Sequence, residues 1–278
     1  MFNFSIIIPY RDKYDMLLKA VDSIPDRDDI QIIIIDNSVQ PLHTEKIPSK
    51  EHATVVFTTS SPTKGAGCAR NEGLRHVKGR FIVFLDADDY FTPNAFDSFG
   101  KYLDSDYDII YFESDSIRLS DGSRSDRHGN MHQYIEAFLK EGNENLLRYR
   151  FVNPVAKMIR ASLVFENNVL FEEVRVSNDA MFSVKTGHYA KKVTASPDVV
   201  YMITEGEKGA SLTKTRTAEN MYIRFQVAVR RYRFITEVGP KDMRPRLSGF
   251  MKFALFHFGP KEFFRYWKYA RENNVCLF

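Results

Sequence analysis

The sequence predicts an α/β protein with a mixed, mostly parallel sheet flanked by helices, followed by a C-terminal helical segment. Short apolar runs alternate with stretches of helical periodicity, which is typical of βαβ units. The runs are rich in isoleucine with few polar interruptions, as expected for strands covered on both faces. Three of them end in clusters of polar side chains. In open parallel sheets such clusters meet at one edge, where ligands bind.

The expected elements follow in order along the first half of the chain. Strands are expected at 4–9, 31–35, 54–58, 80–85 and 108–112, and helices at 14–24 and 65–77. A further helix is expected after Thr92 and Pro93, with the threonine hydroxyl as N-cap and proline at the first helical position. The polar stretch 116–130 is expected to be a loop.

The second half is expected to contain more helix and fewer strands. Apolar patterning resumes at 134–138, 146–151 and 155–164, and a helix is expected at 177–187 with Ser177 or Asn178 as N-cap. Two separate strands are expected at 192–195 and 199–203. Helices are expected at 218–238, 245–258 and 261–273, punctuated by two Gly-Pro pairs.

Charge divides the chain into two parts. The net charge of +3 combines a balance of −6 over residues 1–212 with +9 over residues 213–278, where 14 Lys+Arg face 5 Asp+Glu. Fourteen of the 38 aromatic residues also fall in that last part. We therefore expect a catalytic domain at 1–212 and a basic, aromatic helical extension at 213–278.

The extension allows three interpretations. Its helices pack on the sheet with a solvated basic face, or they lie on an anionic membrane surface. Charge alone is also compatible with nucleic acid, but no recognised motif supports such a partner and none is expected. The sequence does not indicate an oligomeric state.

Cysteine and hydropathy patterns favour a cytoplasmic protein. Cys68 and Cys276 match no metal or redox spacing, and no apolar run approaches the ~20 residues that cross a bilayer. No signal segment is recognisable at the start. The expected location is the cytoplasm, with peripheral contact on the inner face of the plasma membrane under the second interpretation.

An acidic cluster follows the strand at 80–85. Asp86 and Asp88 alternate in an extended segment, so both carboxylates can face one ion, and oxygen-only ligands suit Mg²⁺ or Mn²⁺. The alternative is a solvated acidic turn before the next helix.

Three other polar residues are candidates for ligand binding or catalysis, and each also has a purely structural interpretation. Asp36 ends a strand, where it can contact a nucleobase or ribose or form an Asx turn. Arg70 lies in a helix that begins with small residues, from which it can reach a diphosphate. Asp179 opens a helix, where its carboxylate can act as a base or belong to a helix cap.

These blocks together resemble the family 2 glycosyltransferases with the GT-A fold. The resemblance covers roughly residues 2–212 and rests on FSIIIPYRD, IIIIDN, KGAGCARNEG, GRFIVFLDADDYFTPNAF and SNDAMF, in that order. It implies a Rossmann-like nucleotide-diphospho-sugar transferase domain. The chain departs from the family after Asp36, where a second aspartate and a glycine are missing, which leaves the nucleobase open.

The resemblance also implies roles for individual residues. Pro9, Tyr10, Asp36, Arg70 and Asp86 fall at positions that contact the donor nucleotide.

The remaining positions concern the metal and the acceptor. Asp88 and Asp86 form the D-x-D pair, with Asp88 as the more direct metal ligand. Asp179 corresponds to the catalytic base. Asn178 replaces the usual glutamate beside it, and with Lys157 it falls on the acceptor side.

The implied activity is inverting transfer of a sugar from a nucleotide-diphosphate donor, with a UDP-sugar expected, to a saccharide or lipid-linked saccharide hydroxyl. The implied setting is bacterial surface polysaccharide or glycoconjugate assembly. Lys208, Lys214 and Arg216 are expected to close over the diphosphate.

Two alternatives stay open: a nucleotide-binding protein of this fold without turnover, and a nucleotidyltransferase. The latter normally has a Gly- and Lys/Arg-rich loop after the first strand, where this chain has Pro9-Tyr10-Arg11-Asp12.

Overall fold

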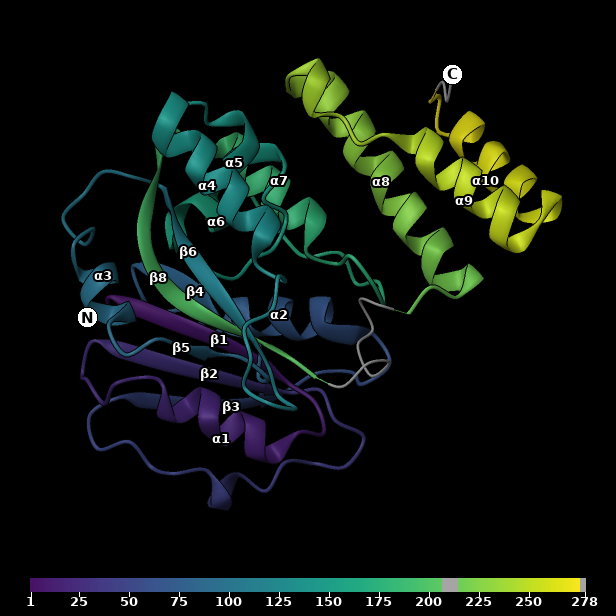
Figure 1. Ribbon diagram of the computed structural model, residues 1–278. Coiled ribbons are helices and arrows are strands. Elements are labelled where there is room, and N and C mark those ends of the chain that lie inside the picture. The colour runs from purple at the N-terminus through teal and green to yellow at the C-terminus, as the bar shows by residue number, and fades with distance from the viewer. Residues whose placement is uncertain (207–214, 276–278) are drawn as a thin grey trace.

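A computed structural model of the chain describes residues 1–206 and 215–275 (Figure 1). The described residues form an eight-stranded sheet in the order β3-β2-β1-β4-β7-β6-β8-β5. The strands are β1 (Phe4–Tyr10), β2 (Ile30–Asp36), β3 (Thr54–Thr59), β4 (Phe81–Phe84), β5 (Tyr90–Phe91), β6 (Ile109–Arg118), β7 (Lys157–Arg160) and β8 (Val193–Glu205).

Parallel pairing joins β3, β2, β1 and β4, and it also joins β6 to β8. The short β7 is antiparallel to both of its neighbours, and β5 is antiparallel to β8. The predicted mixed, mostly parallel sheet is therefore confirmed. The apolar runs form these strands because β-branched side chains pack well on a pleated surface buried on both faces.

Ten α-helices and two 3₁₀ helices accompany the sheet in the described residues. They are α1 (Tyr14–Asp22), η1 (Thr44–Lys46), α2 (Gly65–Arg75), α3 (Ala95–Gly100), α4 (Gly129–Glu141), α5 (Asn145–Tyr149), α6 (Ala161–Glu166), α7 (Ala180–Tyr189), α8 (Ala218–Val238), η2 (Lys241–Met243), α9 (Leu247–Phe258) and α10 (Pro260–Glu272).

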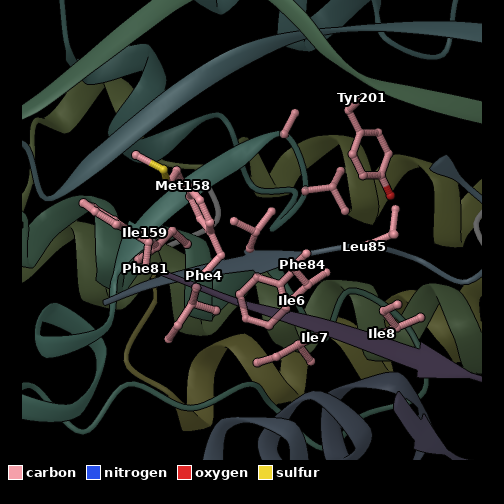
Figure 2. Close-up of a cluster of buried hydrophobic side chains, with 14 of the residues drawn as sticks. Phe4, Ile6, Ile7, Ile8, Phe81, Phe84, Leu85, Met158, Ile159 and Tyr201 are labelled. Atoms are coloured by element: carbon pink, nitrogen blue, oxygen red, sulfur yellow. The ribbon is translucent and has the colours of Figure 1, made fainter. Parts of the chain in front are cut away.

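The main core lies between the sheet and its flanking helices, and Figure 2 shows part of it around β1 and β4. Fully burying one such side chain contributes about 1.5–3 kcal/mol. Helix α2 packs closely on the sheet through Gly73, where a Cβ atom would come within 2.7 Å of Ile7 and 2.9 Å of Ile35. The small residues of this helix therefore have a packing role, as the sequence predicts.

Two predicted details are wrong around β5 and β8. The strands expected at 192–195 and 199–203 are one strand, β8, whose register with β6 shifts on both sides of Glu113. Thr92 is not a helix cap, because α3 begins at Ala95 after Asn94. The Thr92 hydroxyl instead donates to the Val199 carbonyl at 2.7 Å, beside the β5–β8 pair.

Two more expectations need correction. The predicted loop at 116–130 is shorter, since β6 continues to Arg118 and α4 begins at Gly129. Neither Ser177 nor Asn178 is the N-cap of α7. Asp179 holds that position, and its side chain makes no capping hydrogen bond.

The C-terminal helices have a small core of their own. Phe225 and Val229 of α8 pack with residues of α9 and α10, among them Met251 and Tyr266. Figure 1 shows α9 and α10 side by side beyond α8, on the side away from the sheet. α8 also packs on α7 of the sheet-containing part, so it joins the two regions.

Candidate functional site

The carboxyl ends of β1, β2 and β4 meet at one edge of the sheet, as predicted. Tyr10 at the end of β1 lies opposite Asp36 at the end of β2. The Asp12 backbone N–H donates to Ser38 Oγ at 3.1 Å, and Lys13 Nζ lies 2.9 Å from Asp88 Oδ2. The polar residues that follow β1 thus contact those that follow β2 and β4, through backbone and side chains.

Asp36 is buried, and both its oxygens accept backbone N–H groups of the following loop. Ser38 N donates to Oδ1 at 2.9 Å and Leu42 N donates to Oδ2 at 2.7 Å. The first of these bonds is the Asx turn given above as the alternative. It fixes the loop after β2 beside Tyr10, whose hydroxyl pKa is raised, first by burial and then by the Asp36 charge. Pro9 immediately precedes Tyr10 and pairs in register with Ile35.

Asp89 anchors the acidic loop to β8. Tyr201 donates its hydroxyl to Asp89 Oδ2 at 2.9 Å, and Thr204 N donates to Oδ1 at 2.7 Å. Tyr201 Oη also accepts the Asp86 N–H at 3.1 Å, and Figure 2 shows this ring beside Leu85. Burial raises the Asp89 pKa well above its usual value, with Asp86 and Asp88 adding to the effect. Local sequence does not reveal this role of Asp89, because Tyr201 and Thr204 lie over a hundred residues away.

Asp86 and Asp88 differ from Asp89 because their carboxylates reach solvent. Their side chains are 36% and 43% exposed. One oxygen of Asp86 accepts from Arg70, and one oxygen of Asp88 pairs with Lys13. The described residues contain no cluster of three or more metal-ligating side chains. Mg²⁺ commonly uses one or two carboxylates with water and substrate phosphates, so this pair fits such an ion when a diphosphate is bound.

Arg70 bridges the acidic loop and the start of α7. Its Nη2 donates to Asp86 Oδ1 at 2.6 Å and its Nη1 donates to Asn178 Oδ1 at 2.9 Å. Burial acts to lower the Arg70 pKa, but the carboxylates of Asp86 and Asp179 outweigh it, and the pKa is raised. The guanidinium is therefore charged and positioned by partners from two distant segments.

Packing of α2 explains how Arg70 reaches this place. A Cβ atom on Gly67 would lie 2.2 Å from the Glu172 carbonyl, so only glycine permits the loop at 172–178 to approach. Asn71 then exchanges two hydrogen bonds with the Phe171 backbone, at 3.0 and 2.8 Å. The KGAGCARNEG segment thus joins the two halves of the candidate site through Gly67, Arg70 and Asn71.

Asp179 is the N-cap residue of α7 and directly follows Asn178, which accepts from Arg70. Burial raises the pKa of its carboxyl, while Arg70 acts in the opposite direction. The side chain is not used as a helix cap, and its residue is only partly exposed. A carboxylate with a raised pKa beside a solvent-accessible acidic loop has the properties of a general base.

Lys157 is fully enclosed. Its Nζ donates to the Phe151 carbonyl at 2.7 Å and lies 4.5 Å and 5.0 Å from the ring centres of Phe151 and Tyr111. Burial lowers the pKa of this amine well below its usual value, and Asp179 partly opposes the shift. Because the side chain is 1% exposed, it does not line an accessible acceptor surface. Sequence spacing shows that a lysine is near the site but not which way it points.

Of the three basic residues expected to close over the diphosphate, the structure describes only Arg216. Lys208 and Lys214 lie outside the described residues. The Arg216 guanidinium lies 5.6 Å from the ring centre of Phe253 in α9, so in this structure it contacts the C-terminal helices. A hollow of about 460 Å³ elsewhere, between α4 and the β6–β8 pair, contains none of the candidate site residues.

Comparison with known proteins identifies the class. The sequence profile described as "Glycosyl transferase family 2" matches residues 5–165, which is more than half of the chain. This chain therefore belongs to glycosyl transferase family 2. The match confirms the family resemblance and the expected glycosyltransferase class.

Two bacterial glycosyltransferases are among the relatives that the chain matches. The chain is 26% identical over 212 residues to a poly(ribitol-phosphate) beta-glucosyltransferase of Bacillus spizizenii, covering 71% of this chain and 31% of the relative. It is 29% identical over 120 residues to WfaP of Escherichia coli, named UDP-Glc:alpha-D-GlcNAc-diphosphoundecaprenol beta-1,3-glucosyltransferase, covering 41% of this chain and 48% of WfaP. The chain thus spans a third to a half of the length of these two relatives.

Solved structures share the fold. TarS residues 1–349 of Staphylococcus aureus, in complex with UDP-GlcNAc, superpose with a TM-score of 0.66 at 19% identity, covering 92% of this chain and 73% of that one. The mannosyltransferase PcManGT of Pyrobaculum calidifontis, in complex with GDP-Man and Mn²⁺, gives 0.53 at 15% identity, covering 97% and 75%. The predicted GT-A fold is confirmed by these likenesses.

Proposed function

We propose that the protein is an inverting glycosyltransferase that moves a sugar from a UDP-sugar to an acceptor hydroxyl. The observation that carries the proposal is the Arg70 bridge, which joins Asp86 on the donor side to Asn178, the neighbour of Asp179. A donor diphosphate bound at the acidic loop would thereby place its sugar near a carboxylate suited to proton removal. The UDP-GlcNAc bound by TarS supports a uridine nucleotide.

The donor side is assigned to the sheet edge. Pro9, Tyr10 and Asp36 border the nucleoside, and Asp86 and Asp88 would hold Mn²⁺ or Mg²⁺. The ion, when bound, stabilises negative charge on the leaving diphosphate. Arg70 adds a fixed positive charge from the protein and orients Asp86, so less reorganisation is needed during the reaction. The complex of PcManGT with Mn²⁺ supports this choice of metal.

Asp179 is assigned as the catalytic base. It accepts the proton of the acceptor hydroxyl as that oxygen attacks the anomeric carbon from the face opposite the diphosphate. Its raised pKa makes it a stronger base than an ordinary aspartate, and the Arg70 charge limits that rise. A single displacement inverts the anomeric configuration. Asn178 positions Arg70, and Lys157 acts on Asp179 through the electrostatic field alone.

The acceptor is assigned to bacterial surface glycan assembly, as a saccharide, a lipid-linked saccharide or a polyol phosphate chain. The relatives named for poly(ribitol-phosphate) and diphosphoundecaprenol acceptors support this range. Both kinds of acceptor carry phosphate.

Peripheral contact with the inner face of the plasma membrane is assigned to the α9–α10 hairpin. No helix in the described ranges is both long and apolar enough to span a bilayer. The turn at Gly259 joins the two helices, and near it Phe256 and Phe264 are 79% and 62% exposed. Exposed basic residues accompany these rings: Lys252, Lys261, Lys268 and Arg271. Aromatic side chains beside basic ones are typical of surfaces that bind anionic lipid.

The donor assignment is tested by thermal stabilisation with a panel of UDP-, GDP- and TDP-sugars, each with and without Mn²⁺. Binding of one donor raises the unfolding temperature in a concentration-dependent way. The expected result is stabilisation by a UDP-sugar that requires Mn²⁺ or Mg²⁺. If no nucleotide-sugar stabilises the protein, the donor assignment is wrong. If one does but no turnover follows, the protein is a binding protein of the same fold.

A further inference from the structure

Three arginines gather where α5, α8 and η2 meet. Arg150 follows α5, Arg231 lies in α8 and Arg244 follows η2. Arg150 Nη2 donates to the carbonyls of Asp242 and Arg244, at 2.9 and 3.4 Å. Arg231 Nη2 donates to the Tyr149 carbonyl at 3.3 Å, one residue from Arg150. We call Arg150, Arg231 and Arg244 the arginine cluster.

The arginine cluster has no carboxylate partner among residues 1–206 and 215–275. None of its members forms an ion pair there, whereas the neighbouring Arg230 pairs with Glu172. Within the described residues, the Nε atoms of Arg231 and Arg244 are buried without an acceptor, and the Arg244 guanidinium lies 5.4 Å from the ring centre of Tyr232. Buried charges are normally paired, and unpaired ones cost stability. Hydrogen-bond donors and positive charge are thus both in excess at this place.

The cluster lies close to the proposed catalytic base. Val227 of α8 packs on Ala180 and Met181, the two residues after Asp179. Arg231 is one helical turn after Val227 and therefore on the same side of α8. Burial, followed by the Arg150 charge, lowers the Arg231 pKa to about 10, and Asp179 acts in the opposite direction. The guanidinium and the carboxylate therefore interact electrostatically.

We infer that the arginine cluster is a binding site for a phosphate group of the acceptor, next to the hydroxyl that Asp179 deprotonates. A phosphate would accept hydrogen bonds from the Nη groups of the partly exposed Arg150 and Arg231 and would offset the uncompensated positive charge. The planar guanidinium matches phosphate oxygens with paired hydrogen bonds. This inference rests on the proposed function and narrows its acceptor to phosphate-bearing compounds. It also gives α8 a role in the site.

The test measures binding of ribitol 5-phosphate by titration, with uncharged ribitol as the control ligand, so that no turnover is needed. Wild type is expected to bind the phosphate compound and not ribitol. Arg231→Gln and Arg150→Gln are each expected to weaken that binding at least about tenfold, the loss of one charge-assisted pair. Arg233→Gln is the matched control, since Arg233 is exposed on α8 and, in the part of the chain that the structure describes, bonds only Asn273 at 3.4 Å. It is expected to bind as wild type does.

A second arm separates acceptor phosphate from donor diphosphate. Wild type saturated with UDP and Mn²⁺ is expected to bind ribitol 5-phosphate with unchanged affinity. Displacement by UDP would place the phosphate in the donor site and overturn the inference. It would also be overturned if wild type did not bind the probe, or if both glutamine variants bound it normally. If Arg231→Gln does not fold, Arg150→Gln still tests the inference, because Arg150 lies outside a helix. Since UDP binding is measured in the same series, failure of the donor assignment is seen independently.

Discussion

The sheet edge and the C-terminal helices differ in how fully their charged groups are paired. At the edge, each described carboxylate has a defined partner: Asp36 accepts backbone N–H groups, Asp86 accepts from Arg70, and Asp89 accepts from Tyr201 and Thr204. In the C-terminal region, Arg231 and Arg244 have buried Nε atoms without acceptors, and large aromatic side chains are exposed. The carboxylates of the first region are therefore held in place by their partners. The second region contains hydrogen-bond donors without acceptors among the described residues, and this contrast can be tested by substitution.

The largest expected effect is at the meeting point of the two regions. Asp179→Asn removes the proton acceptor, and transfer is expected to fall by about 10²- to 10⁴-fold, the usual contribution of a general base. Donor affinity is expected to change little, because the assigned donor contacts are elsewhere. Initial transfer rates and calorimetry with UDP check the two halves of the prediction. Transfer at the wild-type rate would remove Asp179 as the base.

The sheet edge is tested by Asp88→Ala. UDP binding in Mn²⁺ is expected to weaken at least about 10- to 100-fold, the loss commonly seen when even an outer-shell partner of a metal ligand is removed. Metal-free UDP binding is expected to be similar in the two proteins. Asp97→Ala, which removes an exposed carboxylate of α3, is the control. Equal Mn²⁺ dependence in wild type and Asp88→Ala would contradict the metal assignment.

The C-terminal region is tested with vesicles. Trp267 is the single tryptophan of the chain and lies in α10, so its fluorescence reports on the hairpin without labelling. Binding to vesicles with anionic lipid is expected to shift its emission to the blue, and the Phe256→Ser, Phe264→Ser double variant is expected to bind about tenfold or more weakly, since each buried ring contributes about 1.5–3 kcal/mol.

Leu170→Ser provides the control for that measurement, because Leu170 is an exposed apolar residue of the sheet-containing part. It is expected to bind vesicles normally. A blue shift that depends on protein concentration and not on lipid would instead mean that the hairpin binds a second copy of the chain.

A smaller effect concerns pH and Asp89. Its folded-state pKa is raised above the unfolded value of about 3.9, so its contribution to stability is complete below that pH and is lost as pH rises through the folded pKa. In metal-free buffer, stability is expected to decline over that window by at most about 1.4 kcal/mol per pH unit. Asp89→Asn is expected to flatten the decline. Denaturant melts at several pH values give the free energy of unfolding of both proteins. An equal dependence of that free energy on pH in wild type and Asp89→Asn would refute the prediction.

The sequence predicts those parts of the fold that depend on local pattern. Isoleucine runs identify the buried strands, and α8 has its predicted bounds because helical periodicity there is strong. The errors occur where distant partners decide. Thr92 bonds to Val199 instead of capping α3, and β8 is continuous because β6 pairs along most of its length.

The candidate site divides in the same way. The motif order brings Asp36, Arg70, Asp86 and Asp179 to attention, but spacing does not reveal that Arg70 bridges to Asn178 across 108 residues. Lys157 could not be distinguished from an acceptor contact, because burial among aromatic rings is a tertiary property. The arginine cluster is spread over three elements and has no sequence motif.

The central claim, inverting sugar transfer by the Asp86, Asp88 and Asp179 set, is tested most directly by the stereochemistry of turnover. The protein is incubated with an α-linked UDP-sugar and Mn²⁺, and proton NMR follows the first sugar product, transferred to an acceptor or released to water. A β-configured product is expected at the earliest times, together with free UDP. An α-configured product, or no nucleotide release from any sugar donor under conditions where UDP binds, would contradict it.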